Sequence, residues 1–429
     1  MVNILLFFTP TLALPHRGGG IYCGFFDSLQ TILIKEGALG INQNMVKSDC
    51  RYFLGDRPCR FHKAEGIKCT DCDRYSAPAM RVLIIKLGAM GDVLRTTSIL
   101  PTLSKQYGSP HITWLTAEES LELLEGIPMI DSLMDCGGGS LARLGVETFD
   151  LVISPEAAKD SAALATIAKG KEKKGFGLST TGFVFPFNKQ AEEIFHMGLF
   201  DDVKRRNQKT YEQLICELSG LSYDRVPPVL GLADDEMRFA EAFRTRRGIK
   251  KNRPVIGINT GGAGRWPLKL WTMGGFVNLA EKLSSQMDAQ ILLLGGPAEA
   301  ETNREILSQL GGMVVDAGCF NSPKRFAALI NLCHVVVTGD TLALHMGLAL
   351  HKRTVVLFGP TSATEIDLYG LGRKITAEMD CLCCYRQDCD KSPNCMENIS
   401  VETVYESVEE QIRFLDESPN EGICYHSNI

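Results

Sequence analysis

The stretch VVVTGDTLALHMGLALHKRTVVLFGPT, residues 335–361, decides the fold of this chain. Two β-branched runs, at 335–338 and 354–358, flank a segment long enough for a helix of about three turns. Buried runs separated by a helix are typical of a βαβ unit in a parallel sheet. The turn 338–341 lies where the first strand ends and the helix begins, which is where open α/β sheets bind ligands and where a helix N-terminus favours phosphate. The stretch therefore predicts a ligand-binding edge of a parallel sheet.

Two residues beside this turn, Thr341 and His345, lie four positions apart and therefore share one helical face. That face is directed back towards the turn, where it can meet a bound ligand. The alternative is purely structural, with Asp340 capping the helix and His345 serving as a core histidine. A short motif does not decide between these interpretations.

The same alternation of strand and helix occurs twice along the chain and predicts two Rossmann-like α/β domains. In the first half, strands are expected at 81–87, 111–116 and 149–154, and helices at 92–107, 118–125 and 157–168. In the second half, strands are expected at 254–260, 291–296, 313–316, 335–338 and 354–358, and helices at 271–287, 298–310 and 323–332. A charged helical linker at 234–252 joins the halves, and 169–209 is a less regular segment rich in Gly, aromatic and basic residues.

Composition places the chain among soluble proteins that do not bind nucleic acid. Of its 429 residues, 45% are hydrophobic and 22% charged, as in ordinary globular domains. The net charge of −6 argues against a general nucleic-acid partner. No run approaches the ~20 apolar residues of a transmembrane helix. Residues 1–44 are expected to be a disordered leader or a mis-assigned start, and a cleaved signal peptide is the alternative.

Nine of the 15 cysteines lie in two clusters, at 50–72 and 381–395, which favours metal binding or free thiols in a reducing compartment. The first cluster, in a module at 45–80, contains Cys50, Cys59, Cys69 and Cys72. Its Cys-x-x-Cys pair suits one tetrahedral metal, zinc before an iron–sulfur cluster by base rate, with His62 as a spare candidate. The alternative is four ordinary thiols in a linker. The second cluster contains Cys381, Cys384, Cys389 and Cys395, where a thiol-rich disordered loop competes with a metal site.

Five motifs in chain order resemble glycosyltransferase family 9, the bacterial ADP-heptose:lipopolysaccharide heptosyltransferases. They are LGAMGD at 87–92, INTGGAGRWPLKLW at 258–271, LLLGGPAEAE at 292–301, the Asp-Thr-x-x-x-His turn at 340–345, and VLFGPT at 356–361. The resemblance covers roughly residues 81–415 and implies the GT-B fold, with two Rossmann-like domains facing across a cleft. One departure is Leu342, because the family usually has Gly after Asp-Ser/Thr. In that fold the helix expected at 401–415 crosses back to the first domain, before a tail at 416–429.

Sugar transfer needs a base for the acceptor hydroxyl and charge stabilisation for the leaving diphosphate. Asp92 is the expected base, since it follows a strand end and matches the family's proposed catalytic Asp. Gly88 and Gly91 leave room for the acceptor to approach the backbone. The alternative role for Asp92 is a helix N-cap.

The second domain, 253–400, is expected to hold the nucleotide sugar. Lys269 resembles the family's phosphate-binding lysine, and the amides of a glycine loop face the diphosphate. The predicted donor-binding residues are Gly261, Gly262, Lys269, Gly295, Gly296, Asp340, Thr341 and His345. Gly264 belongs to the same loop, and Arg265 either assists or is an exposed surface residue. No catalytic metal is expected, because GT-B transferases generally work without one.

The resemblance implies an inverting transferase that moves heptose from ADP-heptose to a lipid-linked acceptor of the lipopolysaccharide inner core. The first domain, 81–233, is expected to bind this lipid A-core acceptor through Lys171, Lys173 and Lys174, with the protein in the cytoplasm on the inner-membrane surface. At least two of Phe176, Phe183, Phe185 and Phe187 are expected in the core. A nucleotide-sugar epimerase of the same architecture and a non-catalytic nucleotide-sugar-binding protein are the alternatives.

Overall fold

The computed structural model describes residues 45–262 and 267–417. These residues form two compact units, which divide between Ser76 and Ala77. The predicted leader 1–44, the predicted loop residues Gly264 and Arg265, and the end of the predicted tail lie outside the described residues. The larger unit, from Ala77 onwards, contains both α/β halves.

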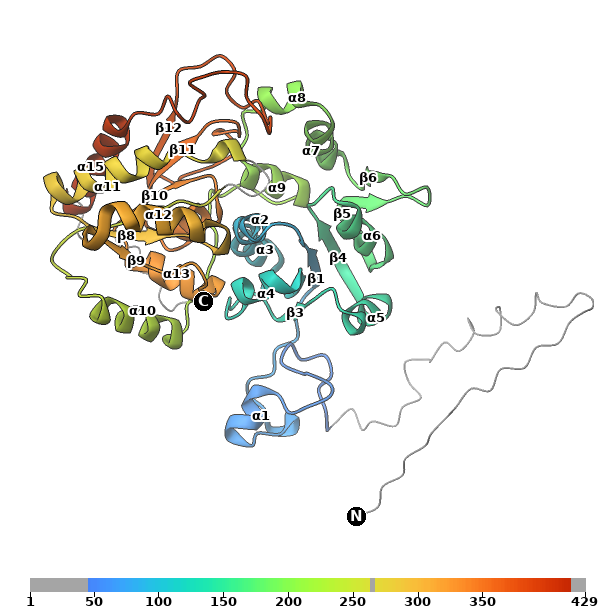
Figure 1. Cartoon of the computed structure of the whole chain (residues 1–429). Helices are drawn as coiled ribbons and strands as arrows, with labels where there is room; N and C mark the ends of the chain where they lie inside the picture. The colour runs from blue at the N-terminus through green and yellow to red at the C-terminus, as the bar shows by residue number, and fades with distance from the viewer. Residues whose placement is uncertain (1–44, 263–266, 418–429) are drawn as a thin grey trace, which may run out of the picture. The chain divides into compact units, whose positions relative to one another are not determined.

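The first domain is built on a six-stranded sheet in the order β3-β2-β1-β4-β5-β6, in which only β6 is antiparallel (Figure 1). Its strands are β1 (Arg81–Ile85), β2 (His111–Leu115), β3 (Ser132–Met134), β4 (Thr148–Ser154), β5 (Lys169–Leu178) and β6 (Val184–Pro186). Its helices are α2 (Met90–Thr96), α3 (Ile99–Tyr107), α4 (Glu118–Leu124), α5 (Gly138–Val146), α6 (Lys159–Ile167), α7 (Lys189–Leu199), α8 (Asp201–Arg206) and α9 (Tyr211–Ser219).

The second domain has an all-parallel sheet in the order β12-β11-β10-β7-β8-β9. Its strands are β7 (Val255–Asn259), β8 (Gln290–Leu294), β9 (Val314–Asp316), β10 (Val335–Gly339), β11 (Arg353–Phe358) and β12 (Gly372–Thr376). Its helices are α11 (Met273–Met287), α12 (Ala300–Leu310), α13 (Pro323–Asn331), α14 (Leu342–Ala349) and α15 (Val401–Glu417), and short 3₁₀ turns lie at Pro267–Lys269, Pro297–Glu299 and Gly311–Met313. The linker helix α10 (Asp234–Arg246) joins the domains. Two α/β domains with parallel sheets confirm the predicted fold class.

The central strands are buried because helices cover both faces of a parallel sheet. Strand β10 is buried along its whole length, as the run VVVTG predicts. One apolar cluster includes residues of both domains, with Leu94 and Leu123 of the first domain beside Ala343 and Met346 of the second. The two domains therefore share apolar burial next to the loops that carry the predicted site.

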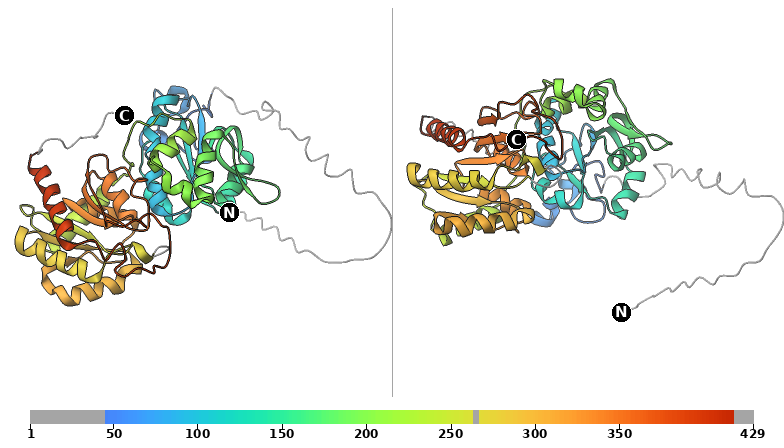
Figure 2. Two further views of the ribbon diagram at one scale, coloured as in Figure 1. Left: turned by 90° about the horizontal axis from the view of Figure 1, so that it is seen from above. Right: turned by 45° about the horizontal axis from the view of Figure 1, so that its top comes forward.

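Three regions differ from the sequence-based expectations. The helix expected at 92–107 is two helices, because Thr97 exchanges hydrogen bonds with the backbone of Val229 and Pro101 lies in the first turn of α3. The irregular segment 169–209 contains β5, β6, α7 and α8. Helix α15 buries Val404 and Val408 in the core of the second domain, so the expected crossing to the first domain is wrong. Figure 2 shows α15, in red, along the second domain.

Strand β5 escaped prediction because its sequence, KGKEKKGFGL, lacks apolar alternation. Strand β5 forms because its backbone pairs with β4, which the sequence pattern does not predict. Of the four phenylalanines in this region, Phe176 is fully buried and Phe187 packs against an apolar cluster, which confirms that at least two belong to the core. No helix within 45–262 and 267–417 is long and apolar enough to cross a membrane.

A substitution at Gly175 tests how closely the backbones of β4 and β5 approach each other. Its φ is +94°, and a Cβ atom there would lie 1.9 Å from the carbonyl oxygen of Ser154. Gly175→Ala should therefore lower the free energy of unfolding by about 2–4 kcal/mol, measured by urea titration. Gly198→Ala, in α7 with nothing near its Cβ position, is the matched control and should leave stability unchanged or raise it by up to about 1 kcal/mol, because a helix favours Ala over Gly. Equal effects at both positions would contradict this account of the junction.

Candidate active site

The loop 87–92 after β1 is held in place by Glu156. One carboxylate oxygen of Glu156 accepts hydrogen bonds from the amides of Leu87 (3.0 Å) and Gly88 (3.1 Å). The other lies 3.3 Å from Nζ of Lys86, which is buried and also donates to the carbonyl of Gly88. A Cβ atom at Gly88 would lie 2.1 Å from Glu156, so the carboxylate occupies the space beside this glycine. The expected acceptor contact at Gly88 stays a prediction.

Asp92 lies in the first turn of α2, where its carboxylate is 43% exposed and its Oδ1 is 3.7 Å from Nε of Arg95. The alternative role of Asp92 as a helix N-cap does not fit, because Ala89 is the N-cap of α2 and Asp92 lies three residues further along. Exposure leaves the carboxylate free to meet an acceptor hydroxyl, which a general base must reach.

A buried cation lies one turn after Asp92. The guanidinium of Arg95 stacks 3.5 Å from the ring centre of Tyr211, and its Nε has no hydrogen-bond partner in the described structure. Burial opposes the charged form of Arg95, but the negative charges of Asp92 and Glu212 raise its pKa above the ordinary value. Tyr211 is oriented by Thr96, whose hydroxyl is 2.8 Å from the phenol oxygen.

Glu212 is the buried acid of this group. Burial raises its pKa to about 7, and the positive charge of Arg95 opposes that shift. One of its carboxylate oxygens has no partner within the described residues. Glu212 therefore changes charge near neutral pH, close to the groups around Asp92.

The carboxyl ends of β7 and β10 carry the predicted donor residues. Nζ of Lys269 is 2.9 Å from Oδ2 of Asp340, and both side chains are largely covered. Burial acts to raise the pKa of Asp340, but Lys269 outweighs it and holds that pKa low. Asn259 donates to the hydroxyls of Thr338 (3.0 Å) and Thr341 (3.2 Å). The structure thus brings Lys269, Asp340 and Thr341 together at one sheet edge.

The predicted glycines line the same edge. Gly262 has a φ of +134° and lies beside Thr341 and Lys269. At the end of β8, the amide of Gly296 donates to Glu299 (2.9 Å), and a Cβ atom at Gly295 would lie 2.8 Å from the amide nitrogen of Asn303. A Cβ atom at Gly261 would be 3.5 Å from the carboxyl carbon of Glu299. Glu299 thus lies beside Gly295 and Gly296 at the end of β8 and beside Gly261 after β7.

His345 joins the two domains. A Cβ atom at Gly91 would lie 3.2 Å from Cδ2 of His345 and 3.7 Å from the backbone of Leu342. Burial, reinforced by the positive charge of Arg95, lowers the pKa of His345 to about 4, so the ring is neutral. These contacts match the packing interpretation of His345 and fill the space expected beside Gly91. The donor role of His345 and the acceptor role of Gly91 stay predictions.

Lys171, Lys173 and Lys174 do not form one free cationic surface. Lys171 is exposed but pairs with Asp150, and Nζ of Lys173 donates to the carbonyl of Thr166. The side chain of Lys174 is largely covered and lies 3.3 Å from Glu172. Successive residues of a strand point to opposite faces, so Lys173 and Lys174 cannot act side by side. This correction removes the physical basis for docking an acceptor on the three lysines together.

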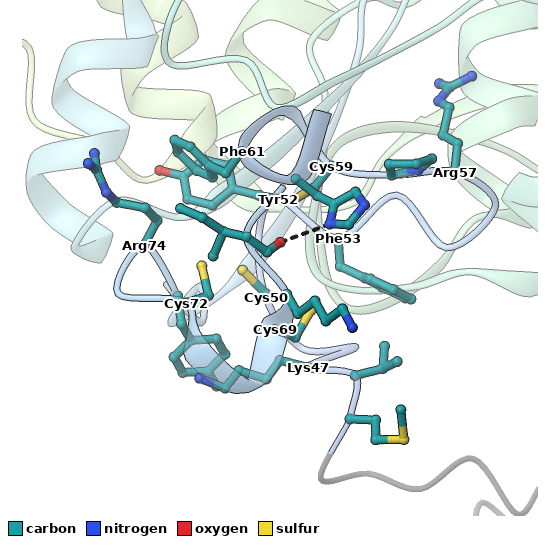
Figure 3. Close-up of a pocket in the computed structure, with 17 residues that line it drawn as sticks. Lys47, Cys50, Tyr52, Phe53, Arg57, Cys59, Phe61, Cys69, Cys72 and Arg74 are labelled. Carbon is teal, nitrogen blue, oxygen red and sulfur yellow. Dashed lines mark hydrogen bonds between the residues drawn. The ribbon is translucent and has the colours of Figure 1, made fainter. Parts of the chain in front are cut away.

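All eight predicted metal-ligating cysteines are free thiols. Cys50, Cys59, Cys69 and Cys72 line one cavity in the N-terminal unit (Figure 3). In the second cluster, burial and the neighbouring Cys384, Cys381 and Cys389 raise the pKa of Cys395, so these thiols lie near one another. Within 45–262 and 267–417, no three His, Cys, Asp or Glu side chains are already arranged to hold a metal ion.

Sequence reasoning missed Arg95, Tyr211, Glu212 and Glu156. Each is an ordinary polar residue in a helix or after a strand, and no spacing marks it. A weak signal existed for Arg95, because a positive charge one turn after a predicted catalytic Asp shares its helical face. The partnership of Thr96 with Tyr211 spans 115 positions and has no local signature.

Comparison with known proteins identifies relatives of this arrangement. The model of glycosyltransferase family 9 (heptosyltransferase) matches residues 140–394, which include the donor edge and begin after Asp92. Lipooligosaccharide heptosyltransferase 2 of Haemophilus influenzae is 24% identical over 311 residues, covering 66% of this chain and 84% of the relative. Lipopolysaccharide heptosyltransferase 2 of Salmonella typhimurium is 24% identical over 312 residues, with the same two coverages.

Solved structures share the fold. The family 9 glycosyltransferase of Veillonella parvula superposes with a TM-score of 0.62 at 20% identity, covering 79% of this chain and 98% of that one. The ADP-heptose lipopolysaccharide heptosyltransferase II of Escherichia coli gives a TM-score of 0.61 at 19% identity, covering 79% and 100%. The fold of both domains is therefore that of the heptosyltransferases.

Glu212 predicts a pH dependence of stability. Because its pKa rises from 4.5 to about 7 on folding, the folded state binds the proton more tightly. Its contribution is complete below about pH 4.5 and is lost as the pH rises through about 7, by roughly 2–3 kcal/mol. Urea unfolding of wild type and Glu212→Gln at pH 5 and pH 8 should show this loss in wild type only. The exposed control Glu301→Gln should keep the wild-type slope, and an identical slope in Glu212→Gln would contradict the assignment.

Proposed function

This chain belongs to glycosyltransferase family 9, the heptosyltransferases, and we propose that it transfers heptose from ADP-heptose to a lipopolysaccharide inner-core acceptor with inversion. The names of its relatives support both substrates, since these proteins are lipopolysaccharide or lipooligosaccharide heptosyltransferases and one is named for ADP-heptose. One observation carries the proposal. The half-exposed carboxylate of Asp92 lies on α2, and α2 meets the start of α14 at Gly91. Helix α14 begins just after Asp340, which pairs with Lys269.

Asp92 is the proposed general base. It takes the proton from the acceptor hydroxyl as that oxygen attacks the anomeric carbon of the heptose, while the bond to the ADP β-phosphate breaks. Arg95 is covered and lies behind Asp92, so it orients the carboxylate without itself being exposed to the acceptor. Neutral His345 adds no charge beside the base.

Lys269 and the backbone amides of Gly261 and Gly262 are proposed to stabilise the leaving diphosphate. In the structure, the charge of Lys269 is matched by Asp340. An incoming diphosphate therefore competes with Asp340 for Lys269, and the attraction strengthens as negative charge develops on the leaving group. Gly295 and Gly296 are proposed to lie on the nucleoside side. No catalytic metal is needed in this scheme, because Lys269 and the amides supply the stabilisation.

The assay that tests this function distinguishes the role of the proposed base, Asp92, from that of the proposed diphosphate-binding cation, Lys269. Asp92→Asn should lower the transfer rate by ~10²–10⁴ and leave ADP-heptose affinity unchanged, because the base acts on the acceptor. Lys269→Ala should weaken both ADP-heptose binding and turnover, whereas exposed Lys251→Ala should change neither. Transfer is measured as heptosylated acceptor from truncated lipopolysaccharide, and binding by calorimetry.

Two results would overturn the proposal. Isomerised free nucleotide sugar would indicate an epimerase, and donor binding without any turnover would indicate a binding protein. An Asp92→Asn variant with more than about half of the wild-type rate would remove Asp92 from the mechanism.

The acceptor is lipid-linked, so we propose that the first domain meets the cytoplasmic face of the inner membrane. The region of β6, α7 and α8 exposes four large apolar side chains: Phe183, Phe185, Leu199 and Phe200. Helix α8 adds Lys204, Arg205 and Arg206 in its last turn, where Arg206 pairs with Asp202 and Lys204 lies over the ring of Tyr385. β6 packs on α7, and α7 on α8, so these groups belong to one part of the domain. Exposed aromatic residues beside basic ones suit an anionic membrane surface.

Replacing Phe183, Phe185 and Phe200 together by Ser should abolish sedimentation with phosphatidylglycerol vesicles at low salt. The physical reason is that aromatic side chains insert at the headgroup level while the basic residues attract the anionic surface. Phe320→Ser is the matched control, because this residue is 81% exposed but lies in the second domain. It should keep vesicle binding, and all variants should keep donor affinity. Unchanged sedimentation of the triple variant would place the membrane surface elsewhere.

A further inference from the structure

The N-terminal unit has a defined chain path but no buried side chain. Residues 45–76 contain one helix, α1 (Arg60–Glu65), and the 3₁₀ turn η1 (Cys69–Asp71). Every one of these residues is at least partly exposed, and none belongs to an apolar core cluster. Burial of apolar surface is the dominant favourable term in folding, so this unit lacks the ordinary source of stability.

The remaining interactions within the unit are of the weak, exposed kind. The amide of Arg51 donates to the carbonyl of Ser76 (2.8 Å), and Nδ1 of His62 donates to the carbonyl of Ile67 (2.9 Å). Arg60 lies over the rings of Tyr52 (4.6 Å) and Phe61 (4.7 Å). Contacts of this type at exposed sites stabilise little. A unit of this size without a core usually needs disulfides or a metal.

Four thiols are placed to supply that cross-link. Cys50, Cys59 and the pair Cys69 and Cys72 come from three separate places in the chain, and all four line one cavity of about 230 Å³ (Figure 3). Cys59 directly precedes α1, while Cys69 and Cys72 bracket η1. All four are free. The chain path has therefore gathered residues from positions 50 to 72 around a single point, which neither the helix nor the 3₁₀ turn requires.

We propose that Cys50, Cys59, Cys69 and Cys72 together bind one zinc ion, and that this ion holds the N-terminal unit folded. Four thiolates close a tetrahedral shell and leave no position for a substrate, so the site is structural. The thiols are not yet arranged as a metal-holding group, so binding has to draw them together within the cavity. Because an unfolded chain offers no such site, the binding energy becomes folding energy. This inference does not depend on sugar transfer.

Metal content of the full-length protein tests the ligand set. Protein purified anaerobically under reducing conditions is analysed for zinc and iron as wild type, Cys69→Ser, Cys72→Ser and Cys136→Ser. Cys69→Ser and Cys72→Ser should each contain one zinc fewer than wild type. Cys136→Ser changes an exposed free thiol outside the unit and should keep the wild-type content. Equal zinc in all variants overturns the site, and iron in place of zinc overturns the identity of the metal.

Limited trypsin digestion tests the structural role independently of metal analysis. The unit carries exposed Lys and Arg residues, so cleavage reports whether it is folded. In wild type, a chelator should increase cutting within residues 45–76 at least about tenfold, while the α/β domains stay intact. Cys72→Ser should be cut at that rate without chelator. Unchanged cutting after zinc removal overturns the proposal. So does the finding that the four cysteines form two disulfides in the purified protein. Donor binding is unaffected in either case, so failure here is distinct from failure of the transferase assignment.

Discussion

The close approach of Gly91 to His345 and Leu342 is the contact on which the site depends. It lets the start of α2 and the start of α14 meet without a side chain between them. Any other residue at position 91 would place a Cβ atom 3.2 Å from Cδ2 of His345, which is closer than an ordinary van der Waals contact. Through this contact, the loop with the proposed base and the turn proposed to bind the leaving group become parts of one arrangement.

Burial at this contact determines the charges around it. His345 loses water and becomes neutral, whereas Arg95 stays charged because Asp92 and Glu212 surround it with negative charge. Removing charged groups from water is costly unless they are paired, and Arg95 is paired with Asp92. Lys269 and Asp340 form the matching pair in the second domain. The cation of this proposed donor site is thus already paired with Asp340, so the proposed binding of a diphosphate exchanges one anion for another.

The chain uses two different solutions to stability. Both α/β domains bury β-branched strands such as β10 under helices, and they share an apolar cluster. Residues 45–76 include no fully buried side chain and instead gather thiols around a cavity. The departure at Leu342 belongs to the first solution, since this side chain packs against the shared cluster. It gives the two domains apolar contact at the start of α14.

The sequence alone determined most strands, most helices and the positions of Asp92, Lys269 and Asp340, because each depends on a local pattern or on the end of a strand, whereas β3 and β12 at the sheet edges were not expected. Tertiary structure alone decided the partners. Tyr211 meets Thr96 across 115 positions, and Glu156 holds a loop 68 positions away. Strand β5 forms because it pairs with β4, although its lysine-rich sequence has no apolar alternation. Packing also places α15 on the second domain. Local patterns report hydrogen bonding and burial along the chain, whereas pairing of charges depends on which distant segments packing brings together.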